Sequence, residues 1–254
     1  MEYNYHTHTY LCKHAKGDVE DYVKAAIDAG FKGLGFSDHG PLLKNWIRMS
    51  EDDFNNHYLK EIERCKKKYK NIKIFSGLEI EYYSEYNKLY EKYLTKLDYL
   101  ILGQHQLSIN EYGVFKQLPF EALEIYKNDC IKAMESGYFK IWAHPDVILF
   151  RNQLWNNQVE AIFEELILSA IKNDVYLEVN CNGIRNNSVV NTPYGESYAF
   201  PRLEFWQLVK KHPEAKVIIG VDAHDPKHLS SQSINDAIEF CNRLGLNVHK
   251  KITF

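Results

Sequence analysis

The chain has 254 residues, of which 45% are hydrophobic and 26% are charged, so it can bury a substantial core as one large α/β barrel or as two ordinary domains. Its formal net charge is −3, with 31 basic and 34 acidic residues, which argues against general nucleic-acid binding because such binding needs a clustered positive field. No apolar run approaches the roughly 20 residues of a membrane-spanning helix, the five cysteines lack CxxC spacing, and the N-terminus carries no signal-like segment. We therefore expect a reduced, cytoplasmic protein outside any membrane.

Short apolar runs alternate with longer amphipathic segments along the whole chain. The strand-like runs are residues 3–7, 33–37, 72–80, 98–103, 140–143, 175–180 and 216–221. The helix-like segments lie between and after them, at about 18–29, 52–69, 85–95, 120–136, 157–173, 201–211 and 232–243. Seven strand–helix repeats without a linker predict a single α/β domain over residues 1–254, and a parallel sheet of this size favours closure as a TIM-like (β/α)7 barrel.

Potential metal ligands stand at the ends of these apolar runs, where a barrel places its active site. His6 and His8 end the first run, and Asp222 and His224 end the last. Because a strand repeats every two residues, both members of each pair face the same side. A closed barrel would bring the two pairs together. The runs between them end in, or are followed by, further candidates: His14, His39, Glu79, His105 and His144.

One His-x-His motif is weak evidence, since a chain with 11 histidines is expected to contain about 0.5 such motifs by chance. The evidence for a metal site is the recurrence of potential ligands at the ends of the strand-like runs. Polar residues buried there without partners would cost several kcal/mol, which a metal compensates. The alternatives are capping or core roles for the two pairs, and a turn for Asp38-His39 before Gly40. Mixed imidazole and carboxylate ligands suit Zn²⁺, Mn²⁺ or Fe²⁺, and the set is large enough for two or three ions.

Glu79 lies inside an apolar run, so its carboxylate needs a strong partner, such as a bridging position between two cations. Glu81 has the same parity, and we expect it behind the ligands or at the surface. The remaining histidines do not follow strand ends and are expected to have no such role: His57, His212, His228 and His249.

The order of these motifs resembles that of the polymerase-and-histidinol-phosphatase (PHP) superfamily. The matching segments are HTH at 6–8, His14, SDH at 37–39, GLE at 77–79, GQH at 103–105, AHPD at 143–146 and DAH at 222–224. Within the superfamily, residues 6–42 resemble the monofunctional histidinol-phosphatase branch of histidine biosynthesis. The resemblance implies a distorted seven-stranded barrel with a trinuclear metal centre.

The family ligand sets carry over without a missing position. One metal would take His6, His8, Glu79 and Asp222. A second would share Glu79 and add His105 and His144, and a third would take His14, His39 and His224.

This metal centre predicts a phosphatase mechanism. A hydroxide held between the metals can attack phosphorus in line while the cations neutralise the phosphoryl charge, and we assign catalytic roles to Glu79, Asp222 and His224. A phosphomonoester dianion also favours guanidinium groups. The candidates are Arg151, Arg185 and Arg202, although each could be a solvated surface charge; that interpretation is preferred for Arg48, nearer the second loop.

The favoured function is hydrolysis of the small-molecule phosphomonoester L-histidinol phosphate to L-histidinol and phosphate. An alternative is a PHP-family phosphoesterase acting on a sugar phosphate, a phosphotyrosine peptide or a nucleic-acid end, and the balanced net charge argues against the last of these. A third hypothesis, a metal-binding or regulatory module without catalysis, predicts lost ligands, and none is lost. We expect neither nucleic acid nor a membrane as a partner, and the sequence predicts no oligomeric state.

Overall fold

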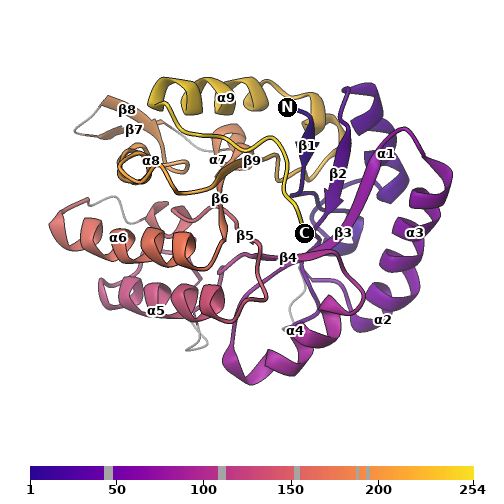
Figure 1. Ribbon diagram of the computed structural model, residues 1–254, viewed down its shortest axis with the longest axis horizontal. Helices are drawn as coiled ribbons and strands as arrows, with labels where there is room; N and C mark the ends of the chain where they lie inside the picture. Colours follow the sequence, from indigo (N-terminus) through magenta and orange to yellow (C-terminus); the bar gives the residue numbers. More distant parts are fainter. Residues whose placement is uncertain (43–47, 108–112, 152–154, 187–188, 193–194) are drawn as a thin grey trace.

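Seven parallel strands surround the centre of the protein, and helices cover them on the outside (Figure 1). The computed structural model describes residues 1–254 except 43–47, 108–112, 152–154, 187–188 and 193–194. The strands are paired in the order in which they follow one another in the chain: β1 (Tyr3–Asn4), β2 (Gly33–Phe36), β3 (Lys73–Ile80), β4 (Tyr99–Leu102), β5 (Ile141–Trp142), β6 (Tyr176–Asn180) and β9 (Val217–Gly220). The predicted seven-stranded βα barrel is therefore confirmed.

The helices lie between these strands in the sequence or, for the final helix, after the last strand. They are α1 (Val19–Asp28), α2 (Glu51–Asp53), α3 (Leu59–Lys68), α4 (Asn87–Leu94), α5 (Glu121–Glu135), α6 (Asn157–Lys172), α7 (Cys181–Asn186), α8 (Leu203–Lys210) and α9 (Gln232–Leu244). Short turns of 3-10 or π helix add η1 (Tyr10–Cys12), η2 (Phe54–Tyr58), η3 (Ser84–Tyr86), η4 (Val147–Leu149) and η5 (Pro226–Ser230).

Two features were not predicted from the sequence. The helix expected over 52–69 is interrupted by the π turn η2 between α2 and α3. After β6 the chain forms the short helix α7 and the antiparallel hairpin of β7 (Val189–Thr192) and β8 (Gly195–Tyr198) before it reaches α8. The hairpin lies apart from the seven-stranded sheet (Figure 1).

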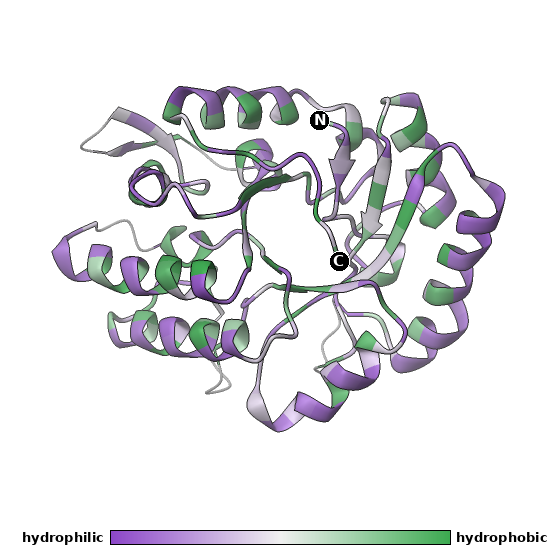
Figure 2. Ribbon diagram, viewed as in Figure 1, coloured by the Kyte–Doolittle hydropathy of each residue, from purple (hydrophilic) through white to green (hydrophobic). Residues whose placement is uncertain are grey.

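Local sequence explains where the helices begin and which face they bury. At the start of α1, Asp18 accepts a hydrogen bond from the backbone of Asp21, and the Asp21 side chain accepts one from the backbone of Asp18. This capping box satisfies donors that the first helical turn leaves unpaired. Hydrophobic and hydrophilic residues alternate along the outer helices (Figure 2), as expected for helices with one buried face. Among the described residues, no helix combines the length and the apolar composition that crossing a bilayer requires.

Inside the barrel, a separate buried cluster contains Tyr5, Tyr99, Ile101, Ile141, Ala143, Tyr176, Ile218 and Ile252. The hydroxyl of Tyr99 lies 2.5 Å from the carbonyl oxygen of Tyr5 and 3.1 Å from that of Phe36. One side chain on β4 thus contacts the backbone of two neighbouring segments across the barrel. These tyrosines fill the interior below the ends of the strands.

The first and last strands meet at the end of the barrel that carries the candidate ligands. Thr7 forms an isolated parallel bridge with Ala223. The backbone amide of His8 donates to the carbonyl of Ala223 at 2.9 Å, and the Asn4 side chain accepts from the amide of Val221 at 2.9 Å. This seam places the segments 6–8 and 222–224 side by side.

Candidate metal centre

Glu79, on β3, lies at the middle of a cluster of imidazoles and is buried. Its Oε2 lies 3.4 Å from Nε2 of His6, 3.4 Å from Nε2 of His8 and 3.1 Å from Nδ1 of His39. Its Oε1 faces the other way, 2.9 Å from Nε2 of His144 and 3.4 Å from Nε2 of His105. The two carboxylate oxygens therefore face two different groups of histidines, which is the arrangement a bridging ligand requires.

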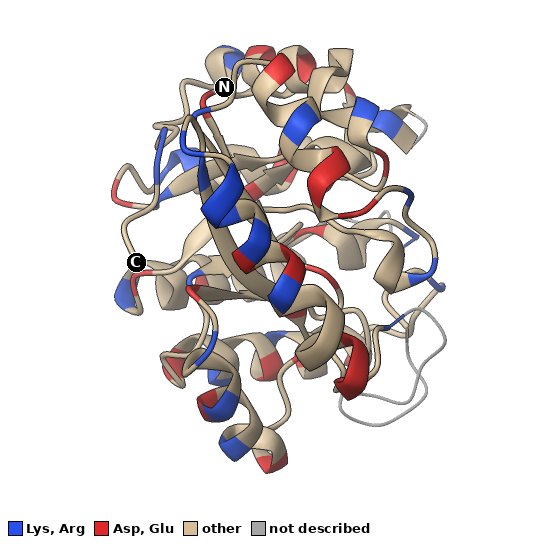
Figure 3. Ribbon diagram, turned by 90° about the vertical axis from the view of Figure 1, so that its right-hand side faces the viewer, with Lys and Arg blue, Asp and Glu red and all other residues tan. Residues whose placement is uncertain are grey.

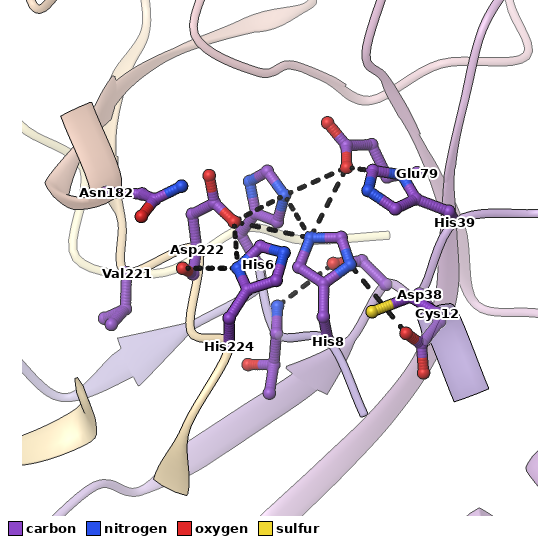
Figure 4. Close-up of polar contacts among 12 residues, drawn as sticks. His6, His8, Cys12, Asp38, His39, Glu79, Asn182, Val221, Asp222 and His224 are labelled. Carbon is purple, nitrogen blue, oxygen red and sulfur yellow. Dashed lines mark hydrogen bonds and ion pairs between the residues drawn. The ribbon is translucent and has the colours of Figure 1, made fainter. Parts of the chain in front are cut away.

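Asp222 and His224, which follow β9, complete the cluster on the other side of the seam. Asp222 Oδ1 lies 3.4 Å from Nε2 of His8, 3.7 Å from Nε2 of His6 and 3.2 Å from Nδ1 of His224. His224 Nε2 lies 3.0 Å from Nε2 of His14. Figure 4 shows the side chains of His6, His8 and Asp222 directed toward one another, with Glu79 and His39 beside them. The structure thus brings together all nine residues that the sequence singled out.

The spacing of these donor atoms fits metal binding. Two nitrogens on one tetrahedral zinc lie about 3.3 Å apart, and Nε2 of His6 lies 3.0 Å from Nε2 of His8. Donor atoms of His6, His8 and Asp222 all lie within 4.8 Å of one another, as do those of His6, Glu79 and His144, and those of His8, His39 and His224. Within the described part of the chain, four buried atoms of the cluster lack a hydrogen-bond partner: Nδ1 of His8, His39 and His144, and Oδ1 of Asp222.

The electrostatics of the cluster also favour cations. Although burial disfavours their charge, the facing imidazoles hold the pKa of Glu79 and of Asp222 well below the usual range, so both carboxylates are anionic. Burial lowers the pKa of His8 to about 3 and that of His39 well below its usual value. Neutral imidazoles keep a lone pair for a metal. Together the cluster offers anionic oxygens and, at His8 and His39, neutral nitrogens, a donor set that suits Zn²⁺, Mn²⁺ or Fe²⁺.

Two of the candidate ligands have a left-handed backbone, which is rare for residues other than glycine. The φ angle is 47° at Asp222 and 32° at His144. Such conformations cost of order 1–3 kcal/mol and persist where surrounding contacts hold them, often at functional sites. At Asp222, Arg185 donates to the carbonyl oxygen at 2.8 Å and Asn180 donates to Oδ2 at 3.0 Å.

Sequence reasoning missed residues that orient these ligands from behind. Glu178 on β6 is buried, and its Oε2 lies 2.8 Å from Nδ1 of His6, which leaves Nε2 directed at Glu79 and Asp222. Asp38 accepts from the amide and hydroxyl of Thr9 at 3.0 and 2.5 Å, and its Oδ1 lies 3.8 Å from Nδ1 of His8. A signal for Glu178 was present, since it is a carboxylate inside an apolar run, as Glu79 is.

A cavity of about 460 Å³ opens onto the cluster. Seven of the nine candidate ligands line it: His14, His39, Glu79, His105, His144, Asp222 and His224. Its other described lining residues are Arg48, Gln106, Gly113, Phe115, Asn182, Asn186, Phe200 and His228. His228 was expected to play no part here, but it lines the cavity, and its Nδ1 accepts from the amide of His224 at 3.2 Å.

None of the three arginines predicted to bind phosphate lines this cavity. Arg151 is exposed beside a different cavity, with its guanidinium 4.8 Å from the ring of Phe150. Arg185 is directed at backbone, donating to the carbonyls of Val221 and Asp222 at 3.0 and 2.8 Å. Arg202 is buried and its Nε donates to Glu204 at 2.8 Å. Their positions therefore do not support the predicted phosphate contacts, because these guanidinium groups face other partners or another surface.

The structure also corrects the sequence interpretation of Arg48, which lines the cavity although it was not a candidate phosphate ligand. We expected a solvated surface charge, yet only 2% of Arg48 is exposed. The side chain lines the cavity and pairs with Glu81, which is also buried. A loop position gives no periodic signal from which this inward direction could be predicted.

Comparisons with known proteins agree with the fold and with the order of the motifs. The model of the PHP domain family matches residues 4–182. A probable histidinol-phosphatase of Deinococcus radiodurans is 28% identical over 237 residues, covering 87% of this chain and 85% of that protein. A probable histidinol-phosphatase of Schizosaccharomyces pombe is 30% identical over 262 residues, covering 89% of this chain and 81% of that protein.

Among solved structures, the chain is similar to the histidinol phosphate phosphatase of Lactococcus lactis, crystallised with zinc, L-histidinol and phosphate. The TM-score is 0.74 at 18% sequence identity, and the match covers 97% of this chain and 95% of that one. At this identity the likeness shows a shared fold.

Proposed function

The chain belongs to the PHP domain family, and on that premise we propose that it is a metal-dependent phosphomonoester hydrolase whose substrate is L-histidinol phosphate. Residues 1–254 form one metallophosphoesterase domain, and the products are L-histidinol and phosphate, as in histidine biosynthesis. The observation that carries the proposal is the position of Glu79, whose two oxygens face two groups of histidines beside a cavity. The probable histidinol-phosphatases among its relatives support the choice of substrate.

We propose the three ligand sets that the family resemblance implies for the nine candidates; the contact between His14 and His224 and those of Glu79 with His6, His8, His105 and His144 support them, whereas His39 also contacts Glu79. His6, His8, Glu79 and Asp222 would hold one ion; Glu79, His105 and His144 would hold a second; His14, His39 and His224 would hold a third. When bound, such ions act as Lewis acids that activate water and neutralise charge on the phosphoryl group. Zinc is the ion named with the Lactococcus lactis protein, and Mn²⁺ and Fe²⁺ suit the same donors.

The residues of the chain itself supply rigidity and orientation. The carboxylate of Glu178 accepts a hydrogen bond from the Nδ1–H of His6, so that Nε2 keeps its lone pair for a metal. Second contacts of this kind fix the tautomer and direction of a metal-binding imidazole. We assign the catalytic roles to Glu79, Asp222 and His224, since their side chains line the cavity that receives the substrate.

The cavity also offers contacts for the leaving group. Phe115 and Phe200 line it, and 48% of Phe115 is exposed. An aromatic ring such as the imidazole of histidinol packs favourably against such side chains. The amides of Gln106 and Asn182 also line the cavity and can bond the polar edge of that ring or the amine. The volume suits a small molecule.

The runner-up is hydrolysis of another phosphoester by the same centre. A nucleic-acid end is the least favoured, because acidic as well as basic residues lie on the helices seen in Figure 3 and the formal net charge is −3. We propose a small-molecule substrate and neither a nucleic acid nor a membrane as partner.

The test is phosphate release by zinc- or manganese-reconstituted protein from a panel of phosphomonoesters. The panel contains L-histidinol phosphate, a sugar phosphate, a phosphotyrosine peptide and a 3′-phosphorylated oligonucleotide. We expect the highest kcat/KM with L-histidinol phosphate, and no release above background with Glu79→Gln. A clear preference for another member would transfer the function to that phosphoester.

A further inference from the structure

Arg48 lies on the loop between β2 and α2 and is the only lysine or arginine among the described residues that line the cavity. Its side chain is buried, and Nη2 donates to Oε1 of Glu81. Nε and Nη1 have no hydrogen-bond partner within the described residues. A buried cationic donor without an acceptor is costly, so these N–H groups call for an anion that the described part of the chain does not provide.

The pairing with Glu81 holds Arg48 beside the candidate ligands. Glu81 follows Glu79 by two residues, and its Oε1 lies 3.6 Å from Nδ1 of His105. The carboxylate of Glu81 therefore links the guanidinium of Arg48 to His105, a member of the second ligand set. Because one carboxylate already compensates the charge of Arg48, its remaining donors can serve a ligand without leaving Glu81 unpaired.

Resting on the proposed phosphatase function, we propose that Arg48 binds the phosphoryl group of the substrate and the inorganic phosphate that is released. The other lining groups are candidate metal ligands, the imidazole of His228, two phenyl rings, three amides and one glycine. Among them, Arg48 alone carries a permanent positive charge with N–H donors suited to phosphate oxygens. If Arg48 only paired with Glu81, its Nε and Nη1 would remain buried without an acceptor. An apolar pair at these two positions would avoid that cost, because replacing a buried ion pair by apolar side chains is often neutral for stability.

The experiment measures binding of inorganic phosphate to the zinc-reconstituted protein by titration calorimetry. Arg48→Gln should weaken phosphate binding on the order of 30- to 100-fold, as expected for the loss of a charge-assisted contact, while zinc content stays unchanged. Arg64→Gln is the matched control, because it removes the same charge from the outer helix α3, where Arg64 pairs with Glu20 and Glu61. Its phosphate affinity should equal that of the wild-type protein.

A second variant separates phosphate binding from support of Glu81. Arg48→Gln/Glu81→Gln removes the carboxylate that the single variant leaves unpaired, so it should fold, and its phosphate affinity should stay as low as that of Arg48→Gln. Wild-type affinity in either Arg48 variant would overturn the inference. Because the hydrolysis of every phosphomonoester releases inorganic phosphate, this result does not depend on the identity of the substrate. If the protein did not hydrolyse L-histidinol phosphate but still required Arg48 to bind phosphate, only the substrate assignment would be refuted.

Discussion

Adding one methyl group at Gly103 should expel Glu79 from its central position. Gly103 follows β4, and a Cβ built there would lie 2.3 Å from Oε1 of Glu79, 2.6 Å from Cγ and 2.7 Å from Cδ. To restore an ordinary van der Waals separation, the carboxylate must move by about 1 Å. Glu79 cannot swing away freely, because imidazoles lie on both sides of its carboxylate.

The expected loss of zinc affinity is large because a metal site tolerates only small displacements of its ligands. Ligand distances that differ from the ideal by more than about 0.2 Å no longer describe a proper site. In Gly103→Ala we therefore expect zinc affinity to fall by about 100-fold or more, beyond the 10- to 100-fold that outer contacts typically contribute. Overpacking of a dense interior should lower the free energy of unfolding of the metal-free protein by about 1–3 kcal/mol.

The assay combines elemental analysis of zinc with thermal unfolding, with and without zinc. Gly137→Ala is the control, because Gly137 has a φ of 74° and open space where its Cβ would stand. That substitution should cost roughly 1–2 kcal/mol of stability through backbone strain and leave zinc binding unchanged. Full zinc stoichiometry and wild-type turnover in Gly103→Ala would refute the central role of Glu79.

Three further predictions concern the same centre. Purified protein reconstituted with Zn²⁺ or Mn²⁺ should hold two or three ions per chain by elemental analysis; at most one ion would contradict the three ligand sets. Glu178→Gln should weaken zinc binding about 10- to 100-fold, whereas Glu61→Gln on α3 should not, and equal affinities would remove Glu178 from the site. Although burial disfavours the charged rings, carboxylates raise the pKa of His6, His144 and His224, so protons compete with metal at low pH; zinc affinity should fall between pH 8 and pH 6, and a flat profile would disprove this competition.

The positions of the ligands could be predicted because they depend on rules that local sequence obeys. The period of two in a strand places His6 beside His8, and the barrel places the carboxyl ends of all its strands on one face. The same rules do not predict the direction of long side chains outside the strands. Arg48 and Arg185 are both long side chains outside strands, and only the folded chain shows that one turns into the cavity and the other toward the carbonyl of Asp222.

Local departures from regular structure were also beyond prediction. The apolar pattern after residue 52 continues through the π turn η2, so periodicity alone gives one helix where the structure has three segments. The left-handed backbone at His144 and Asp222 depends on contacts with distant residues, not on the preference of either residue. Glu178, like Glu79, is a carboxylate inside an apolar run of the sequence. That pattern marks Glu178 as buried and in need of a partner, but only the structure shows that the partner is His6.

The seam between the first and last strands has a consequence for the synthesis of the protein. His6 and His8 leave the ribosome roughly 200 residues before Asp222 and His224, and closing a loop of that length is a late event in folding. A nascent chain therefore carries the imidazoles of His6 and His8 without the carboxylate of Asp222 while the residues between them are synthesised. The complete first ligand set forms only when Thr7 pairs with Ala223, so a chain interrupted before Asp222 cannot mature into a competent metalloprotein.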